Sequence, residues 1–313
     1  MNVAPIHPFP PRQAPGPGGP LQTLKYLLLA MRPKQWTKNG VVFVAVVFAH
    51  RLGSPRDVLL ALLAVAIFCL VSGVVYIVND LVDLEKDRQH PHKRHRPLAS
   101  GRLRPRTAVV GAVAIGLGSL AVSVAVSPSP LFVLAVVAYV ALNLGYSFYL
   151  KNIVLLDLFG IAGGFLLRAA GGAFIINVPI SPWLYLCTLL GALFIGLGKR
   201  RHELIVLEGT AASHRKILGE YTTEFLEELI TIVSSATLVS YALYTYSSYP
   251  DTHAMMATIP FAVYGIFRYL FLVHLRNEGG APEEILLRDR PLLIDIALWI
   301  ATAGVILYAL NLK

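Results

Sequence analysis

The chain has 313 residues, of which 56% are hydrophobic and only 14% are charged, and its mean hydropathy is +0.63. Soluble domains carry about 25% charged residues, so the composition excludes an ordinary soluble domain and indicates an integral membrane protein. The net charge of +9 comes from residues beside apolar segments, which argues against a nucleic-acid-binding domain with a compact basic surface.

The first twenty residues, MNVAPIHPFPPRQAPGPGGP, differ from the rest of the chain. They are rich in Pro and Gly and have no apolar core, so they lack the central feature of a signal peptide. Segments of this kind do not bury enough apolar surface to fold. We expect residues 1–20 to form a disordered tail and residues 21–313 to form a single polytopic membrane domain.

Nine apolar runs follow, most of them close to the roughly 17–25 residues that a membrane-spanning helix needs. The first run is short, and it either borrows length from the preceding LQTLKYLLLAM or kinks at Pro33. The predicted fold class is therefore all-α integral membrane. The nine runs cover residues 36–50, 58–79, 107–127, 130–149, 154–176, 181–198, 227–249, 257–275 and 291–311.

Lys and Arg are distributed unequally between the connections. The segments 80–106, 199–225 and 276–290 contain eight, five and three of them, and residues 1–38 contain five. The four connections that alternate with these contain two in total. Because basic loops stay in the cytoplasm, we expect a multi-pass protein of the cell membrane with a cytoplasmic N-terminus and an external C-terminus.

The stretch NDLVDLEKD ends the second apolar run and contains Asp80, Asp83 and Asp87, with Asn79 beside them. On a helix these aspartates share one face. Carboxylate and amide oxygens suit Mg²⁺, which binds through one or two carboxylates and completes its shell with water and substrate phosphate. The alternative is a solvated helix end whose carboxylates pair with nearby Lys and Arg. A helix C-terminus disfavours anions, so a bound cation would offset the cost of gathering them there.

This stretch resembles a known family. It matches the N-D-x-x-D-x-x-x-D signature of the UbiA superfamily of intramembrane prenyltransferases, and the following RPLASGRL, which contains Arg96, is similar to that family's continuation. The resemblance implies nine helices around a central cavity, an active site at the cytoplasmic face, and Mg²⁺ held by the aspartate motif.

The loop after the sixth run departs from the family pattern. Most members carry a second acidic motif, D-x-x-x-D, whereas this chain reads GLGKRRHELIVLEG. Glu203 is accompanied there by Lys199, Arg200 and Arg201. Lys and Arg are direct partners of phosphate oxygens, so these residues are candidate contacts to a second anionic group. The alternative is an ordinary cluster of topology-determining charges.

Further basic candidates lie at predicted helix ends. Lys34 and Lys38 in RPKQWTKN are four residues apart and would share a face of an α-helix; snorkelling beside Trp36 is the alternative. Tyr146 and Lys151 in YSFYLKN resemble the family's diphosphate-binding Tyr/Lys pair, although Lys151 also fits a simple stop-transfer residue.

Arg168 falls inside a predicted span, where an Arg is costly and by default marks a cavity or pathway. Neighbouring glycines favour close helix packing, so Arg168 should face inward, with either an architectural or a substrate-binding role. Asp295 lies near the start of the last run, where Arg288 or Arg290 would pair with it.

Taken together, RPKQWTKN, NDLVDLEKD, YSFYLKNIVLLD and GKRRHEL most resemble the phosphoribosyltransferase branch of the superfamily. That resemblance implies that phosphoribosyl pyrophosphate occupies the Mg²⁺ site and that a polyprenyl (decaprenyl-type) phosphate is the acceptor. Such substrates bring more negative charge than two magnesium ions neutralise, which would explain the many cations. A phosphate nucleophile is already anionic at pH 7, so no catalytic base is expected.

Two other functions remain open at this point. A transfer of a prenyl group from a prenyl diphosphate to an aromatic acceptor would use the same Mg²⁺ site, but it predicts the second acidic motif that is missing. A transporter or lipid-binding protein would use the aspartates as an ion site. Transporters usually place such groups near the bilayer midplane, whereas these stand at a helix end.

Overall fold

The computed structural model describes residues 19–90, 93–206, 216–247, 252–276 and 288–309, together with residues 280 and 285. Residues 1–18 of the predicted tail lie outside this described part. Every regular element within it is a helix, which confirms the all-α prediction. The elements are α1 (Pro20–Ala30), η1 (Pro33–Val42), α2 (Phe43–Phe48), α3 (Pro55–Val82), α4 (Leu84–Gln89), η2 (Lys93–His95), α5 (Pro105–Val126), α6 (Pro130–Phe148), η3 (Leu150–Asn152), α7 (Leu156–Ile175), α8 (Pro182–Val206), η4 (Lys216–Glu220), α10 (Thr223–Ser247), η5 (Ala254–Thr258), α11 (Ile259–Leu275), α13 (Arg290–Gly304) and η6 (Val305–Ala309).

Proline and small polar residues determine where several of these helices begin. α3 and α6 each start at a proline, whose missing N–H would have no intrahelical partner at that position. Ser54 and Ser129 precede these prolines, and each side-chain oxygen accepts a hydrogen bond from a backbone N–H of the first turn. Asp289 caps α13 in the same way, accepting from the N–H of Leu292 at 3.0 Å. The three starts lie within a few residues of the predicted ones.

Eight helices in the described part are long and apolar enough to cross a membrane. The remaining predicted run, 36–50, forms η1, a ten-residue 3-10 helix, followed by the six residues of α2. At about 2.0 Å per residue in η1 and 1.5 Å in α2, the two rise by about 29 Å. This approaches the ~30 Å hydrocarbon thickness of a bilayer, because 3-10 winding stretches the segment. A ninth crossing stays a prediction.

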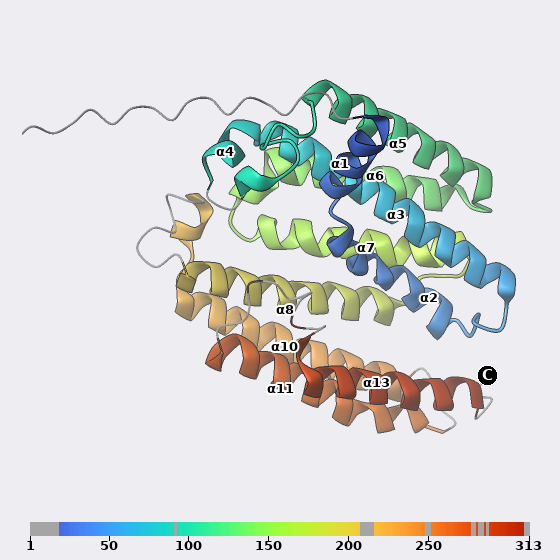
Figure 1. Ribbon diagram of the computed structural model, residues 1–313. Coiled ribbons are helices and arrows are strands. Elements are labelled where there is room, and N and C mark those ends of the chain that lie inside the picture. Colours follow the sequence, from blue (N-terminus) through green and yellow to red (C-terminus); the bar gives the residue numbers. More distant parts are fainter. Residues whose placement is uncertain are drawn as a thin grey trace, which may run out of the picture.

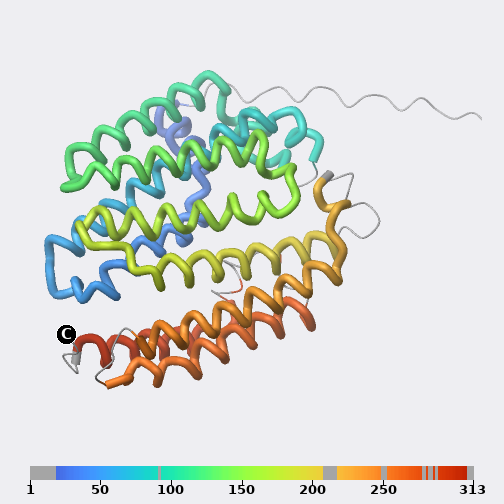
Figure 2. Tube along the Cα trace, turned by 180° about the vertical axis from the view of Figure 1, so that it is seen from behind, coloured from blue at the N-terminus to red at the C-terminus, as the bar shows by residue number. Residues whose placement is uncertain are grey.

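The long helices lie side by side in a bundle, and most neighbours in sequence are neighbours in space (Figures 1 and 2). α7 lies at its centre and packs against α2, α3, α6, α8 and η1. One apolar cluster joins α7 to α2, α3 and α6, and another joins it to α8, α10, α11 and α13. The central helix therefore positions both halves of the molecule.

Burial along η1 repeats every three residues. Asn39 and Val42 are buried and Trp36 is partly buried, whereas Lys34 belongs to an exposed stripe. Because residues three apart eclipse in a 3-10 helix, Lys34 and Lys38 point in directions about 120° apart. The predicted sharing of one helix face by these two lysines is therefore wrong, and the reason is the winding of the helix.

Gly172 of α7 permits the close approach of η1, since a Cβ there would lie 2.1 Å from the carbonyl oxygen of Val42. We expect Gly172→Ala to destabilise the protein by about 1–3 kcal/mol, because a backbone atom cannot move aside as a flexible side chain does. Gly118→Ala in α5 is the matched control, since a Cβ there meets nothing within 4 Å. Thermal unfolding of the purified proteins compares them, and equal Tm values would contradict the close packing.

Candidate active site

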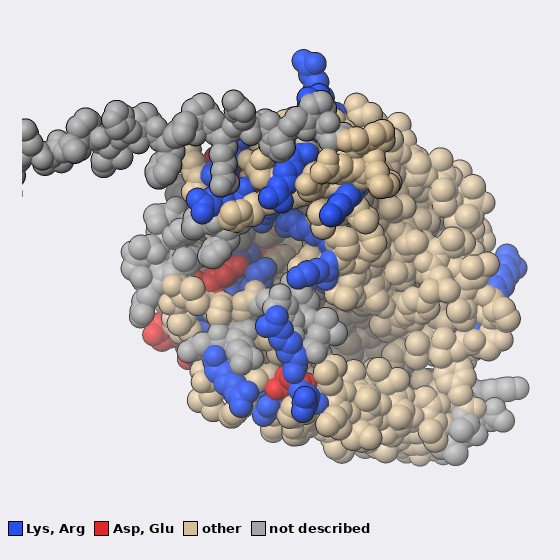
Figure 3. All heavy atoms as spheres, viewed as in Figure 1, with Lys and Arg blue, Asp and Glu red and all other residues tan. Residues whose placement is uncertain are grey.

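Charged side chains gather at one end of the bundle. The C-terminal ends of α3, α6 and α8 meet the N-terminal ends of α7 and α10 there, because consecutive spans run in opposite directions. Figure 3 shows Lys and Arg side chains around a hollow on this side of the molecule, with acidic side chains beside it. The site residues predicted from the sequence belong to these helix ends and their connections, apart from Arg168 inside α7 and from Lys34 and Lys38 in η1.

Asp80, Asp83 and Asp87 lie at the junction of α3 and α4. The Asp83 N–H donates to the Asn79 carbonyl at 2.9 Å and the Asp87 N–H donates to the Asp83 carbonyl at 2.8 Å, so the helical register continues across the junction. Asp80 and Asp87 are buried, with 2% and 3% of their surface exposed, and Asp83 is half-buried. The face predicted from the spacing is thus formed at the end of a helix.

Two arginines bind the buried pair of aspartates. Arg96 Nη1 donates to Asp80 Oδ1 at 3.1 Å and to Asp87 Oδ2 at 2.6 Å. Arg32 Nη2 donates to the same Asp80 Oδ1 at 2.5 Å, and its guanidinium lies 4.7 Å from the ring centroid of Tyr76. Arg32 was not among the residues indicated by the sequence pattern. The one sequence feature that could have indicated Arg32 is its position as a cation shortly before the first apolar run.

The oxygen atoms at this junction suit a hard divalent cation. Carboxylate and amide oxygens are the protein ligands that Mg²⁺ takes. Asn79 Oδ1 is buried and has no hydrogen-bond partner in the described part of the chain, which is costly unless something binds it. No three His, Cys, Asp or Glu side chains of that part are arranged to hold a metal together; Arg32 and Arg96 hold Asp80 and Asp87 instead. The residue types therefore fit the ion, and the carboxylates are already engaged by cations.

A second polar cluster surrounds Arg200, which is 1% exposed. Its Nε donates to Asp157 Oδ2 at 2.6 Å, Nη1 donates to Glu203, and Nη2 donates to the Tyr146 hydroxyl at 3.4 Å. The Tyr221 hydroxyl donates to the other oxygen of Asp157 at 2.8 Å. Burial, together with this bond to a carboxylate, raises the pKa of Tyr221 to about 12. Arg200 is thus engaged by two carboxylates, and its predicted contact to phosphate stays a prediction.

The other basic candidates have different surroundings. Lys151 Nζ lies 3.7 Å from Asp83 Oδ2 and links the aspartate face to η3. Arg201 donates to Glu227 of α10 at 2.7 Å, on a different side of α8 from the Arg200 cluster. Lys199 is half-buried and forms no ion pair with a described residue. Of the three cations in GKRR, Lys199 is therefore the one whose charge is not already matched by a carboxylate.

Arg168 lies about 18 Å along α7 from its first residue and is buried, which confirms that it faces inward. Its guanidinium donates to Asn39 Oδ1 at 2.6 Å, to the Gly164 carbonyl at 3.0 Å and to the Tyr139 hydroxyl at 2.5 Å. Asn39 in turn donates to Cys69 Sγ at 3.2 Å. These contacts tie η1 to α3, α6 and α7, so they favour the architectural role; the substrate role stays a prediction.

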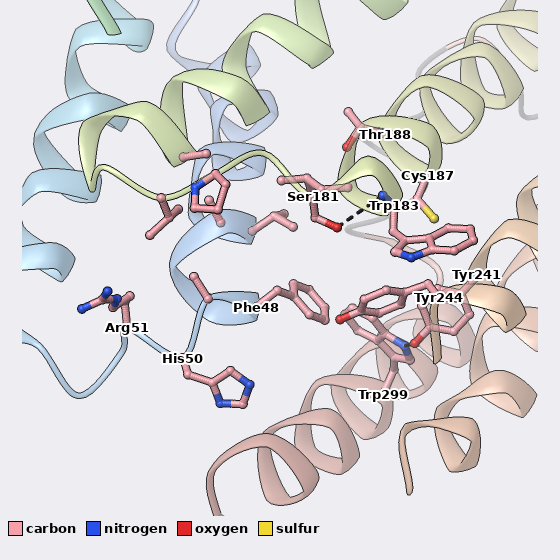
Figure 4. Close-up of a pocket in the computed structure, with 17 residues that line it drawn as sticks. Phe48, His50, Arg51, Ser181, Trp183, Cys187, Thr188, Tyr241, Tyr244 and Trp299 are labelled. Atoms are coloured by element: carbon pink, nitrogen blue, oxygen red, sulfur yellow. Dashed lines mark hydrogen bonds between the residues drawn. The ribbon is translucent and has the colours of Figure 1, made fainter. Parts of the chain in front are cut away.

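A cavity of about 700 Å³ lies at the opposite end of the bundle, between α2, α8, α10 and α13. Figure 4 shows aromatic rings converging on it, with His50 and Arg51 at one side. The aromatic residues of its wall are Phe48, Trp183, Tyr241, Tyr244 and Trp299. The cavity is thus a mainly apolar space that suits a hydrocarbon chain.

A smaller cavity of about 340 Å³ adjoins the first, with Cys187, Tyr241 and Trp299 in the walls of both. Asp295 lines the smaller cavity and is buried. In the described part of the chain it pairs with neither Arg288 nor Arg290, contrary to the expectation from the sequence.

A family model described as the UbiA prenyltransferase family matches residues 40–285. The chain is 35% identical over 291 residues to the decaprenyl-phosphate phosphoribosyltransferase of Mycobacterium tuberculosis, covering 91% of this chain and 95% of that one. It is also 35% identical over 309 residues to the protein of the same name from Mycolicibacterium smegmatis, with 94% and 96% covered.

Solved structures show the same fold. A UbiA homolog from Archaeoglobus fulgidus, solved with GPP and Mg²⁺, aligns with a TM-score of 0.68 over 89% of this chain and 98% of that one. The two sequences are 20% identical. This likeness confirms the helix bundle of the UbiA fold.

Proposed function

Because the chain belongs to the UbiA prenyltransferase family, we propose that it transfers the 5-phosphoribosyl group of phosphoribosyl pyrophosphate to a polyprenyl phosphate of the decaprenyl type. An oxygen of the lipid phosphate forms a new bond to ribose C1. The bond between C1 and the pyrophosphate oxygen breaks, and pyrophosphate leaves with that electron pair. The enzyme is thus a membrane-embedded transferase, and curated relatives that match nearly the whole chain bear the name of this activity.

The ion pairing around Arg200 is the structural observation that favours this donor over a prenyl diphosphate. The second acidic motif of most family members offers carboxylates to magnesium. Here Asp157 and Glu203 bind one buried guanidinium, so these two carboxylates of the described part are not free to hold a metal. A half-buried Lys199 stands on the same helix instead. This balance of charge suits a substrate that carries a further phosphate group.

Asn79, Asp80, Asp83 and Asp87 are the residues that would hold Mg²⁺, which supplies charge stabilisation for departing pyrophosphate when bound. Lys151 lies beside Asp83, which supports a contact between its ammonium and pyrophosphate oxygens. Tyr146, five residues earlier at the end of α6, accepts a hydrogen bond from Arg200 and is proposed to bind pyrophosphate as well. Lys38 and Lys199 supply the remaining positive charge for the 5-phosphate and the lipid phosphate, whereas Arg96, also predicted to bind substrate, is already bonded to Asp80 and Asp87. Lys34 and Arg201 make lesser contributions, because they point elsewhere.

The chain's residues have little covalent chemistry to perform. A phosphate monoester already carries negative charge at pH 7, so the nucleophile needs no general base. Holding the two phosphates and the ribose in line, and matching the charge on the leaving group, supply most of the acceleration. This is consistent with a site built mainly from Asp, Lys and Arg side chains.

The acceptor tail occupies the apolar side of the bundle in this proposal. The cavity at the far end lies near the start of α8, and the Arg200 cluster lies near its end. Seventeen residues separate Trp183 from Arg200 on that helix, which corresponds to about 26 Å. A long polyprenyl chain spans this distance, so its phosphate can reach the charged end while its tail fills the cavity. The charged end faces the cytoplasm, where the water-soluble donor is found.

Lipid extraction after a radiolabel assay tests the reaction. Purified protein in nanodiscs is incubated with labelled phosphoribosyl pyrophosphate, Mg²⁺ and decaprenyl phosphate. We expect label in the lipid fraction and release of pyrophosphate in equal amount. Unlabelled lipid, together with prenyl transfer from a prenyl diphosphate to an aromatic acid in a parallel incubation, would overturn the proposal in favour of the more usual family reaction.

A further inference from the structure

Arg32 and Arg96 share one oxygen atom of Asp80. Both guanidinium groups bond to Oδ1, at 2.5 and 3.1 Å, and the carboxylate is 2% exposed. A buried carboxylate needs a partner for its charge, and here two cations supply it. Any metal ion that binds Asp80 needs the same buried carboxylate.

The two arginines differ in what they retain when they lose Asp80. Arg96 also bonds to Asp87 at 2.6 Å, so it keeps a carboxylate partner. Asp80 is the one carboxylate that Arg32 contacts in the described part of the chain. Its remaining contact is the face of the Tyr76 ring, which is weaker than an ion pair. Arg32 is therefore the side chain that loses its counter-charge if Asp80 turns to a metal.

The backbone holds Arg32 in place between two anchored segments. Met31 packs on Gly73 so closely that a Cβ on the glycine would lie 2.6 to 2.8 Å from its side-chain atoms. On the other side, Asn39 anchors η1 to Arg168 at 2.6 Å. Arg32 itself has φ 54° and ψ 67°, a left-handed conformation that is uncommon for a residue other than glycine. The structure thus fixes the Cα of Arg32 and leaves its long, partly exposed side chain as the movable part.

We infer that Arg32 is an exchangeable counter-ion for Asp80: it gives up this carboxylate when a divalent cation binds and turns to a phosphate oxygen of the diphosphate substrate. The inference rests on the proposed function for the presence of a metal–diphosphate pair at this site. A guanidinium and a divalent cation on one carboxylate repel each other, so the two compete for Asp80. A displaced Arg32 finds a new anionic partner only when the diphosphate is present. Metal and diphosphate therefore bind with positive coupling, each favouring the other.

The direction of the change in metal affinity distinguishes this exchange from the case in which Arg32 only positions the metal ligands. Removing a residue that merely positions a metal site weakens metal binding. Removing Arg32 should instead strengthen binding of the metal alone, because a competitor is gone. The same change should weaken binding of the diphosphate, because a phosphate contact is gone. The coupling between the two ligands should shrink accordingly.

The experiment uses full-length protein in nanodiscs, Mn²⁺ followed by electron paramagnetic resonance, and inorganic pyrophosphate as the anionic probe. We expect Arg32→Gln to lower the Kd for Mn²⁺ alone about tenfold, which equals 1.4 kcal/mol. With saturating Mg²⁺, the Kd for pyrophosphate should rise by about tenfold or more, as expected for a lost hydrogen bond between charged groups. Arg32→Lys keeps the charge and should show a smaller change in both.

Arg88→Gln is the matched control. Arg88 belongs to α4, beside the same aspartates, but it pairs with the exposed Glu85 at 2.7 Å. Arg88→Gln removes the same charge close in sequence to the aspartates but outside their face, so it reports how much Mn²⁺ affinity changes through net charge alone. If Arg32→Gln binds Mn²⁺ no more tightly than Arg88→Gln, the exchange is disproved. A Tm close to that of the wild type shows that Arg32→Gln is folded. If Arg32→Gln does not fold, the Mn²⁺ affinity of Arg32→Lys is compared with that of Arg88→Gln instead.

The outcome is separable from that of the proposed function. The two probes contain neither ribose nor lipid, so tighter Mn²⁺ binding and weaker pyrophosphate binding would support the exchange even if the chain used a prenyl diphosphate. Conversely, transfer of labelled phosphoribose to lipid together with unchanged Mn²⁺ affinity in Arg32→Gln would leave the proposed function standing and remove the exchange.

Discussion

Asp83→Asn is expected to lower the rate of phosphoribosyl transfer by about 100-fold or more, the scale of a lost metal ligand. Asp83 is suited to this test because it is half-buried and its ion pair with Lys151 is long, at 3.7 Å. Its replacement removes a carboxylate from the aspartate face without leaving a buried charge unpaired. The rate of label transfer in nanodiscs at saturating donor measures the effect.

Glu85→Gln provides the comparison for Asp83→Asn. Glu85 follows two residues later, is exposed, and pairs with Arg88 outside the aspartate face. Glu85→Gln removes the same charge at a more exposed position and should leave the rate within about threefold of the wild type, as expected for a surface ion pair. Both variants should keep the wild-type Tm. Retained turnover in Asp83→Asn would remove this residue from the metal role.

Arg200→Met is expected to have the largest effect on stability. It leaves Asp157, which is 0% exposed, without its charged partner, and breaking a buried pair in this way costs about 3–5 kcal/mol. We expect the Tm of the purified protein to fall by roughly 10 °C. The double variant Arg200→Met with Asp157→Asn should recover part of the loss, since it removes the uncompensated charge.

Arg201→Met is the control that shows how much stability is lost when a buried arginine is removed without leaving a buried carboxylate unpaired. Arg201 is also largely buried, but its partner Glu227 has 42% of its side chain exposed and stays hydrated when the arginine is removed. The expected loss is about 1 kcal/mol for the hydrogen bonds. Equal Tm values for the Arg200 and Arg201 variants would contradict the view that the buried Asp157 carboxylate causes the larger loss of stability in Arg200→Met.

The helices and the aspartate face were predictable because their signals are local. Runs of about 20 apolar residues specify spanning helices by length alone. The spacing of Asp80 and Asp87 places both on one face, and a single arginine, Arg96, reaches both. Neither feature depends on knowing which other helix lies nearby.

The partners of the arginines were not predictable in the same way. Arg200 meets Asp157, 43 positions away in the sequence, and Arg32 meets Asp80, 48 positions away. Such contacts depend on how the helices pack, and a single sequence carries no signal for that. The winding of η1 was missed for a different reason. Its buried stripe repeats every three residues, and over ten residues this differs little from the α-helical period.

The aromatic-walled cavity at the far end bears on the length of acceptor that the enzyme can select. It holds about 700 Å³, whereas a decaprenyl chain has about 50 carbons, each with close to the volume of a water molecule. Such a tail needs roughly twice that space at ~30 Å³ per carbon. In the proposed pose, the outermost isoprene units of a decaprenyl acceptor therefore extend into the acyl chains of the bilayer. Discrimination between long and very long acceptors is then a property of the membrane, because the protein contacts only the units between the phosphate and the cavity.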